Sequence, residues 1–130
     1  MDDTQDAPPF PAVESEAESA EKRQHIRIPV HWQAAVMIDQ HPVFGRLSDV
    51  SRGGVTLMCE ANLRPGTKYQ LFIRMPTPDR RSYNQLEVIV QVCNAVLVPK
   101  ENGYRLGMRF LEMRGQTESL LTNYLHTNGG

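Results

Sequence analysis

The sequence of 130 residues contains two cysteines, one tryptophan and no long hydrophobic run. Cys59 and Cys93 lie in separate apolar segments without CxxC spacing, so we interpret them as reduced core residues, with a disulfide between them as the less favoured alternative. A membrane helix needs about 18 consecutive apolar residues, so no membrane insertion is expected. The N-terminus is acidic and proline-rich and does not resemble a secretory signal. We therefore expect a cytoplasmic protein.

Signatures of catalysis and of metal binding are also lacking. The sequence contains no nucleophile elbow, no phosphate-binding P-loop and no paired-carboxylate pattern. The four histidines do not cluster with the cysteines at the spacing of metal ligands. We therefore expect a binding protein that is not an enzyme and holds no metal or cofactor.

The net charge of −1 conceals an uneven distribution along the chain. Residues 1–21 hold seven of the 15 acidic side chains and no basic one, whereas all 14 lysines and arginines follow from Lys22 onward. Fourteen basic and eight acidic residues leave the body at +6, which favours an anionic partner. The first 21 residues are too polar to bury much surface, so they predict a disordered tail; mimicry of a phosphate ligand is the alternative.

Six short segments with alternating or β-branched apolar residues predict strands. They span residues 30–38, 43–50, 55–59, 69–75, 86–98 and 104–111. Trp32 alternates with apolar neighbours and is expected in the core. Residues 116–126 have leucines at helical spacing, and Thr117 is placed to cap that helix. This pattern predicts a mainly β fold, an antiparallel barrel or sandwich, followed by a C-terminal helix.

Two local patterns stand out at turns and segment starts. Arg23-x-x-x-Arg27 opens the basic body, and Asp49-x-Ser51-x-x-Gly54 follows the second predicted strand. Taken singly, the arginines fit a solvated basic patch, and Asp49 with Ser51 fits an ordinary turn closed by side-chain hydrogen bonds. Their occurrence together, in this order, favours a ligand site.

The two patterns together resemble the two-part signature of the PilZ domain family, over roughly residues 21–113. The segment from Tyr104 to Phe110 also resembles the last strand of that family. The resemblance implies a six-stranded antiparallel β-barrel at residues 22–113, preceded by the disordered acidic tail 1–21 and followed by a C-terminal helix and tail at 114–130. It also implies that the ligand is the bacterial second messenger cyclic di-GMP.

The resemblance implies a ligand site whose residue types suit cyclic di-GMP. It contains Arg23, Arg27, Asp49, Ser51 and Gly54, with Lys22, Arg52, Gly53 and Gly107 around them. A guanidinium binds phosphate or the O6 and N7 acceptors of guanine through two hydrogen bonds, and a carboxylate accepts from the donor edge of guanine. Gly54 is expected to let the turn adopt a strained φ. Lys22 departs from the arginine common in the family, which puts a second ligand molecule in doubt.

Three functions remain open at this point. The leading hypothesis is a single-domain cyclic di-GMP receptor, monomer or homodimer, that relays the signal to an unidentified protein partner; the family implies motility, biofilm or exopolysaccharide control. The alternative is a ligand-independent scaffold of PilZ type in pilus assembly. A barrel that binds nucleic acid is disfavoured, because stacking needs exposed aromatic residues and most aromatics here are expected on buried faces. No DNA or RNA partner is therefore expected.

Overall fold

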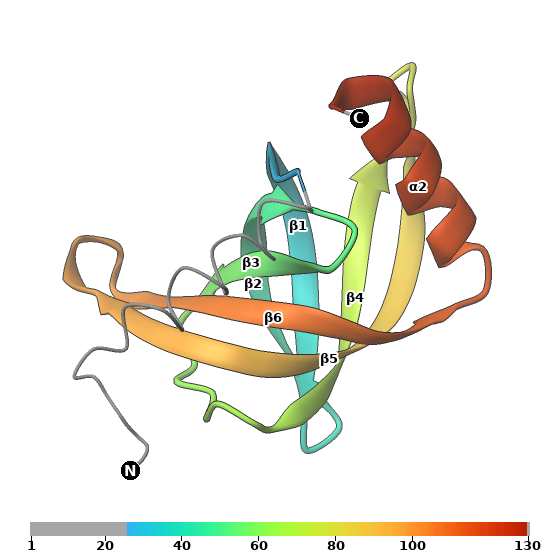
Figure 1. The fold of residues 1–130 in the computed structure, drawn as a ribbon. Coiled ribbons are helices and arrows are strands. Elements are labelled where there is room, and N and C mark those ends of the chain that lie inside the picture. Colours follow the sequence, from blue (N-terminus) through green and yellow to red (C-terminus); the bar gives the residue numbers. More distant parts are fainter. Residues whose placement is uncertain (1–25, 130) are drawn as a thin grey trace, which may run out of the picture.

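Six strands build the computed structural model, which describes residues 26–129. The elements are β1 (Ile28–Ile38), β2 (His41–Val50), β3 (Gly54–Cys59), β4 (Lys68–Pro76), β5 (Tyr83–Val98), the short 3-10 helix η1 (Pro99–Glu101), β6 (Gly103–Arg114) and α2 (Thr117–Asn128). All neighbouring strands are antiparallel, and the order β1-β2-β3-β6-β5-β4 closes into a barrel (Figure 1). The predicted mainly β barrel with one C-terminal helix is confirmed. The predicted tail, residues 1–21, lies outside the described residues.

The strands are longer than predicted, mainly because their turns are tighter. The predicted strands 30–38 and 43–50 left four residues for the first turn. In the structure only Asp39 and Gln40 connect β1 to β2, with φ angles of 51° and 69°. A two-residue turn with positive φ at both residues matches the right-handed twist of the two strands that it connects. Pairing therefore continues to the last possible residues, with Ile38 opposite His41.

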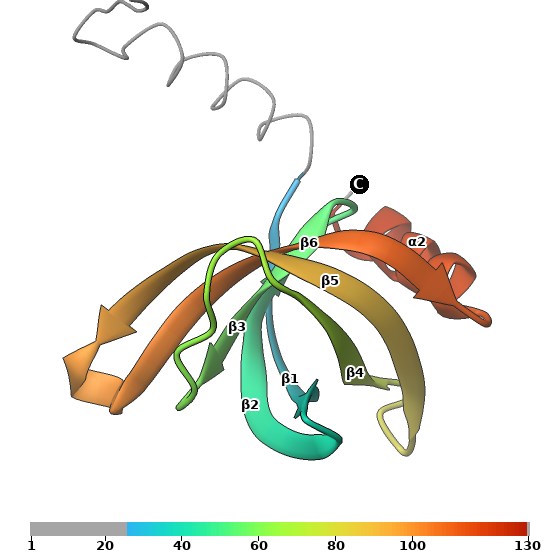
Figure 2. The same ribbon diagram turned by 90° about the horizontal axis from the view of Figure 1, so that it is seen from below.

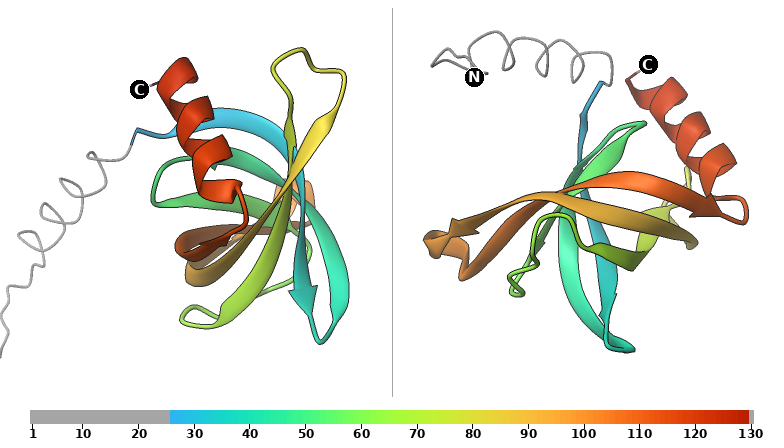
Figure 3. Two further views of the ribbon diagram at one scale, coloured as in Figure 1. Left: turned by 90° about the vertical axis from the view of Figure 1, so that its right-hand side faces the viewer. Right: turned by 60° about the horizontal axis from the view of Figure 1, so that its bottom comes forward.

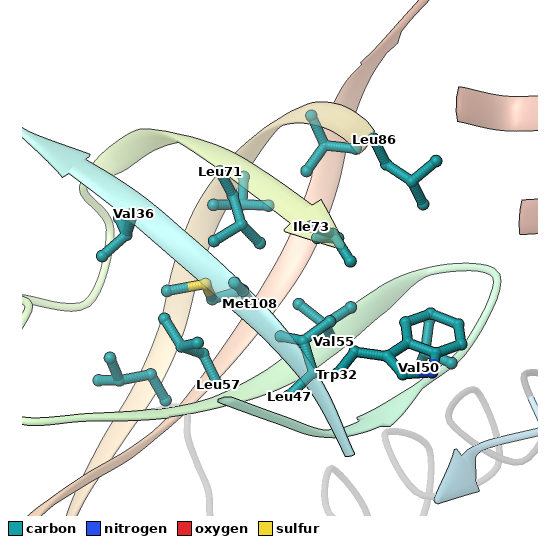
Figure 4. Packing of buried hydrophobic residues seen from close by; sticks show 14 of the residues in the cluster. Trp32, Val36, Leu47, Val50, Val55, Leu57, Leu71, Ile73, Leu86 and Met108 are labelled. Carbon is teal, nitrogen blue, oxygen red and sulfur yellow. The ribbon is translucent and has the colours of Figure 1, made fainter. Parts of the chain in front are cut away.

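Inward-facing side chains from every strand fill the barrel. Val36, Leu47, Leu57, Leu71, Leu86 and Leu106 are fully buried, and Figure 4 shows several of them meeting from different strands. Burying one such side chain contributes about 1.5–3 kcal/mol. Trp32 lies in this core, as predicted. Because the interior is filled, a ligand must bind on the outside of the barrel.

Helix α2 lies across one end of the barrel (Figure 3). Leu121 and Leu125 belong to the same buried cluster as the strand residues. The ring of Tyr124 meets that of Trp32 edge to face, with 4.8 Å between the ring centroids. The helix therefore completes the core at the end opposite the β5–β6 turn.

Thr117 does not cap the helix, contrary to the prediction. The N-cap residue is Gln116, which forms no side-chain cap hydrogen bond. The buried Thr117 hydroxyl instead accepts from the backbone N–H of Glu87 at 3.0 Å and lies 3.3 Å from its carbonyl oxygen. Thr117 therefore ties the first turn of α2 to β5.

One expectation about burial was wrong, that of Cys93. Cys59 is buried, but Cys93 is exposed, and both thiols are free, so the alternative of a disulfide is excluded. Most aromatic residues of the described range are buried or half-buried, as expected, and only Phe44 and Tyr83 are exposed, at 75% and 55%. Both lie on outward-facing strand positions, and the guanidinium of Arg74 lies 4.1 Å from the centre of the Tyr83 ring.

Candidate functional site

The two halves of the sequence motif meet on the outside of the barrel. Arg27 directly precedes β1, and Asp49 lies near the end of β2, opposite Pro29. Arg27 Nη1 donates to Asp49 Oδ1 at 3.0 Å, and Thr56 Oγ1 on β3 donates to the same oxygen at 3.0 Å. No residue in the described range 26–129 donates a hydrogen bond to the other carboxylate oxygen. Among the described residues, the second oxygen of Asp49 is therefore open to a further donor.

A hollow of about 450 Å³ opens beside this ion pair. It is lined by Arg27, Pro29, Arg46, Ser48, Asp49, Thr56, Met58, Glu101 and Arg105. These residues come from the start of β1 and the position before it, from β2, β3 and β6, and from η1. The lining therefore carries three guanidinium groups and two carboxylates.

Strand register explains why three arginines gather there. Arg46 on β2 is opposite Met58 on β3, which in turn is opposite Arg105 on β6. Arg46 also lies 3.7 Å from a carboxylate oxygen of Glu101. Arg46, Glu101 and Arg105 are exposed, and Met58, which is only 9% exposed, lies between the two arginines in the pairing of the strands. Guanidinium groups on a rigid sheet suit a planar anionic ligand that accepts several hydrogen bonds.

Ser51 holds the turn that follows Asp49. Its hydroxyl accepts from the backbone N–H groups of Gly53 and Gly54, each at 3.2 Å, and Ser51 N–H donates to the Gly54 carbonyl at 2.9 Å. Only 2% of the residue is exposed. The structure therefore places Ser51 within the turn and away from the lining of the hollow.

Gly54 was expected to supply a strained φ, and this is wrong. Its φ is not in the left-handed region. A Cβ at this position would instead collide with the carbonyl oxygen of Met108 on β6. The glycine is needed because the backbones of β3 and β6 approach closely here, and Gly53 adds a hydrogen bond from the Phe110 N–H to its carbonyl at 2.9 Å.

The remaining predicted residues lie in different places. Gly107 on β6 is opposite Thr56 on β3, and the Gly107 N–H donates to the Asn94 side chain at 3.3 Å. Arg52 is exposed in the turn and does not line the hollow. Lys22 and Arg23 lie outside the described residues.

Arg46 and Arg105 were missed by the sequence analysis. Arg105 lies two residues before Gly107, so alternation along a strand places both on one face. This spacing was the available signal. Nothing local distinguished Arg46, because its place depends on the pairing of β2 with β3.

The part of the chain that the structure describes holds no group of three side chains able to bind a metal ion. No helix among these residues is long and apolar enough to cross a membrane.

Solved structures share this fold. The Bacillus subtilis inhibitor of motility MotI/DgrA aligns with a TM-score of 0.69 and 18% identity, over 81% of this chain and 50% of that one. YcgR of Escherichia coli in complex with c-di-GMP aligns with a TM-score of 0.62 and 20% identity, over 82% of this chain and 45% of that one. The chain spans about half the length of these two structures.

The PilZ domain of E. coli YcgR with c-di-GMP aligns with a TM-score of 0.53 and 21% identity, over 82% of this chain and 91% of that domain. A search of curated proteins found no match. The model of the PilZ domain family matches residues 21–127, which is most of the sequence. The chain therefore belongs to the PilZ domain family.

Proposed function

We propose that this protein is a receptor for cyclic di-GMP that binds the ligand in the hollow beside Arg27 and Asp49. The observation that carries the proposal is the 3.0 Å contact between these two residues, which unites both halves of the motif at the rim of an arginine-lined surface. Structures of related fold, YcgR among them, contain c-di-GMP. The protein acts as a binding module and catalyses no reaction.

The chemistry of the hollow suits this ligand. Cyclic di-GMP has two phosphodiester anions and two guanine bases. Arg27, Arg46 and Arg105 supply guanidinium groups for phosphate oxygens or for guanine O6 and N7. The free oxygen of Asp49 accepts from the N1–H and N2–H groups of a guanine. Arg23 and Lys22 add two further cations from the segment before the described residues, and Ser51, Gly53 and Gly54 hold Asp49 in position.

Ligand binding changes the pairing of Arg27. In the structure this guanidinium is bound to Asp49, and half of its side chain is exposed. A phosphate that draws Arg27 away, while guanine binds Asp49, gives the bound state contacts that the free state lacks. Such differential contacts are what a ligand needs to shift a conformational equilibrium. This change of pairing at Arg27 is the step through which the signal reaches a protein partner.

The proposal places the protein in the cytoplasm and in the control of motility, biofilm or exopolysaccharide. The exposed free thiol of Cys93 suits a reducing compartment.

Calorimetric titration with cyclic di-GMP tests the proposal, with GTP and linear pGpG as competitors. We expect selective binding that Arg27→Ala weakens by at least about tenfold, because a hydrogen bond to a charged group contributes about 1.5–3 kcal/mol. Arg81→Ala is the matched control, since Arg81 is exposed in the loop between β4 and β5. No binding by the folded protein would contradict the proposal and favour the ligand-independent scaffold.

A further inference from the structure

The β5–β6 hairpin has an unpaired edge beyond the barrel. β4 pairs with β5 only as far as Gln91. Two backbone hydrogen bonds extend this contact to Val92, whose carbonyl accepts from the Gly66 N–H and whose N–H donates to the Thr67 carbonyl. β6 continues along the other side of β5 to the pair Val98 and Gly103. Within residues 26–129, no strand pairs with the outer edge of residues 93–98. Figures 1 and 2 both show this hairpin reaching out from the body of the barrel.

The free edge lacks the charged residues that usually protect such edges. No charged residue occurs between Glu87 and Lys100. Val96 and Leu97 are 51% and 56% exposed, and as neighbours in a strand they point to opposite faces. Proteins commonly guard exposed edges with lysine, with proline or with a covering segment. Here Pro99 comes only after the strand has ended.

We propose that this edge, residues 93–98 of β5, binds the same edge of a second copy of the chain and forms a homodimer. Two identical edges related by a twofold axis pair antiparallel, which leaves each surface self-complementary. The absence of charge means that no like charges oppose one another across the axis. Exposed apolar side chains such as Val96 then gain cross-strand contacts.

The dimer has two structural consequences. A six-residue edge buries less than the ~800 Å² per partner of a standard stable interface, so association is weak and depends on concentration. In the dimer, β5 and β6 of one copy and β5 and β6 of the other form one continuous four-stranded sheet. Arg105 on β6 is opposite Val96 on β5. With a twofold axis near Val96, the two Arg105 side chains lie on the same face of this sheet. They are three strand spacings apart, or roughly 14 Å.

Sedimentation velocity of the full chain, from low to high micromolar concentration, tests the dimer. We expect the weight-average mass to rise toward that of two copies, and the Val96→Lys/Leu97→Lys variant to stay at one copy. Phe44→Lys is the control for adding a lysine at an exposed apolar residue away from this edge, on β2, and it should behave as the parent does. A parent chain that stays monomeric overturns the proposal, as does a dimer that persists in the Val96→Lys/Leu97→Lys variant.

Cross-linking separates edge pairing from other modes of association. Residues opposite each other in antiparallel strands have Cβ atoms about 4.5–5.5 Å apart, close enough for a disulfide after small shifts. In a Cys93→Ser background, Val96→Cys should therefore form a covalent dimer under mild oxidation, whereas Phe44→Cys should not. Equal cross-linking of both variants, or none at Val96→Cys, contradicts pairing through this edge.

Discussion

The guanidinium of Arg27 and the carboxylate of Asp49 meet at 3.0 Å although the two residues are 22 positions apart in the sequence. Antiparallel pairing of β1 with β2 brings them together, because Pro29 is opposite Asp49. Thr56 on the next strand donates to the same carboxylate oxygen. The charge pair is thus held by three successive segments of the barrel, and each partner is partly accessible to a ligand.

Replacing Asp49 by Asn removes the charge and keeps the shape. The free energy of unfolding should fall by less than about 1 kcal/mol, because a partly exposed ion pair contributes little. Affinity for cyclic di-GMP should fall by at least about tenfold, since an amide oxygen accepts more weakly than a carboxylate from the guanine edge. Urea unfolding and calorimetry measure the two quantities separately. Glu118→Gln on α2 is the control, and it should bind as the parent does. Equal affinity of the parent and of Asp49→Asn for cyclic di-GMP would contradict the assigned contact.

Arg105→Gln tests whether the ligand contacts the β6 side of the hollow. The variant should weaken cyclic di-GMP binding by about 10- to 100-fold, which corresponds to the loss of one charge-assisted hydrogen bond. Stability should change little, because Arg105 is exposed. Arg81→Gln, with the same loss of charge outside the hollow, should bind as the parent does. If both variants weaken binding equally, the effect is one of net charge and Arg105 has no direct contact.

Ser51→Ala should destabilise the fold by about 1–3 kcal/mol. The change leaves the N–H groups of Gly53 and Gly54 without their acceptor in a buried turn. Urea unfolding measures the loss. Ser82→Ala is the control, because only its backbone takes part in hydrogen bonds, and it should stay within about 0.5 kcal/mol of the parent. An unchanged Ser51→Ala midpoint would show that the hydroxyl does not hold the turn.

The strands were predictable from the sequence because alternation is a local property. Val30, Trp32, Ala34 and Val36 are all buried in β1, and the residues that alternate with them are exposed or half-buried. The role of Gly54 was not predictable in the same way. Glycine usually indicates a special φ, but here the approach of β6, more than 50 residues later in the chain, requires it.

The motif residues of the candidate site were visible in the sequence, whereas its arginine surface was not. Arg27 and Asp49 stand in recognisable patterns. Arg46 and Arg105 become neighbours of Met58 only through the register of three strands, which no local pattern encodes. The exposure of Cys93 has a local cause, because Leu86, Val88, Val90 and Val92 take the buried face of β5 and Cys93 follows on the other face.

Thr117→Val should destabilise the protein by about 1–3 kcal/mol. Valine keeps the shape of threonine but removes the hydroxyl that bonds the backbone of Glu87 in a buried position. Thr127→Val, on the exposed side of α2, is the matched control for the helix propensity of valine. Urea unfolding followed by circular dichroism compares the two. Equal stability of both variants would show that the hydroxyl does not tie α2 to β5.

The two cysteines should differ in reactivity toward iodoacetamide. Burial raises the pKa of the Cys59 thiol above its ordinary value, and only the thiolate reacts. At mildly alkaline pH the folded protein should therefore gain one label quickly, at the exposed Cys93, and a second slowly. Mass spectrometry of peptides after timed quenching identifies each site.

The rate at which Cys59 is labelled should depend on pH and on whether the protein is folded. A raised pKa means that the thiolate of Cys59 increases as the pH rises toward that value, so alkaline conditions should speed its labelling in the folded protein. In guanidinium chloride both thiols are solvated, and their rates should become similar. If Cys59 reacts as fast as Cys93 before unfolding, the β3 end of the barrel opens more often than a packed core allows, and the burial of Cys59 does not protect it.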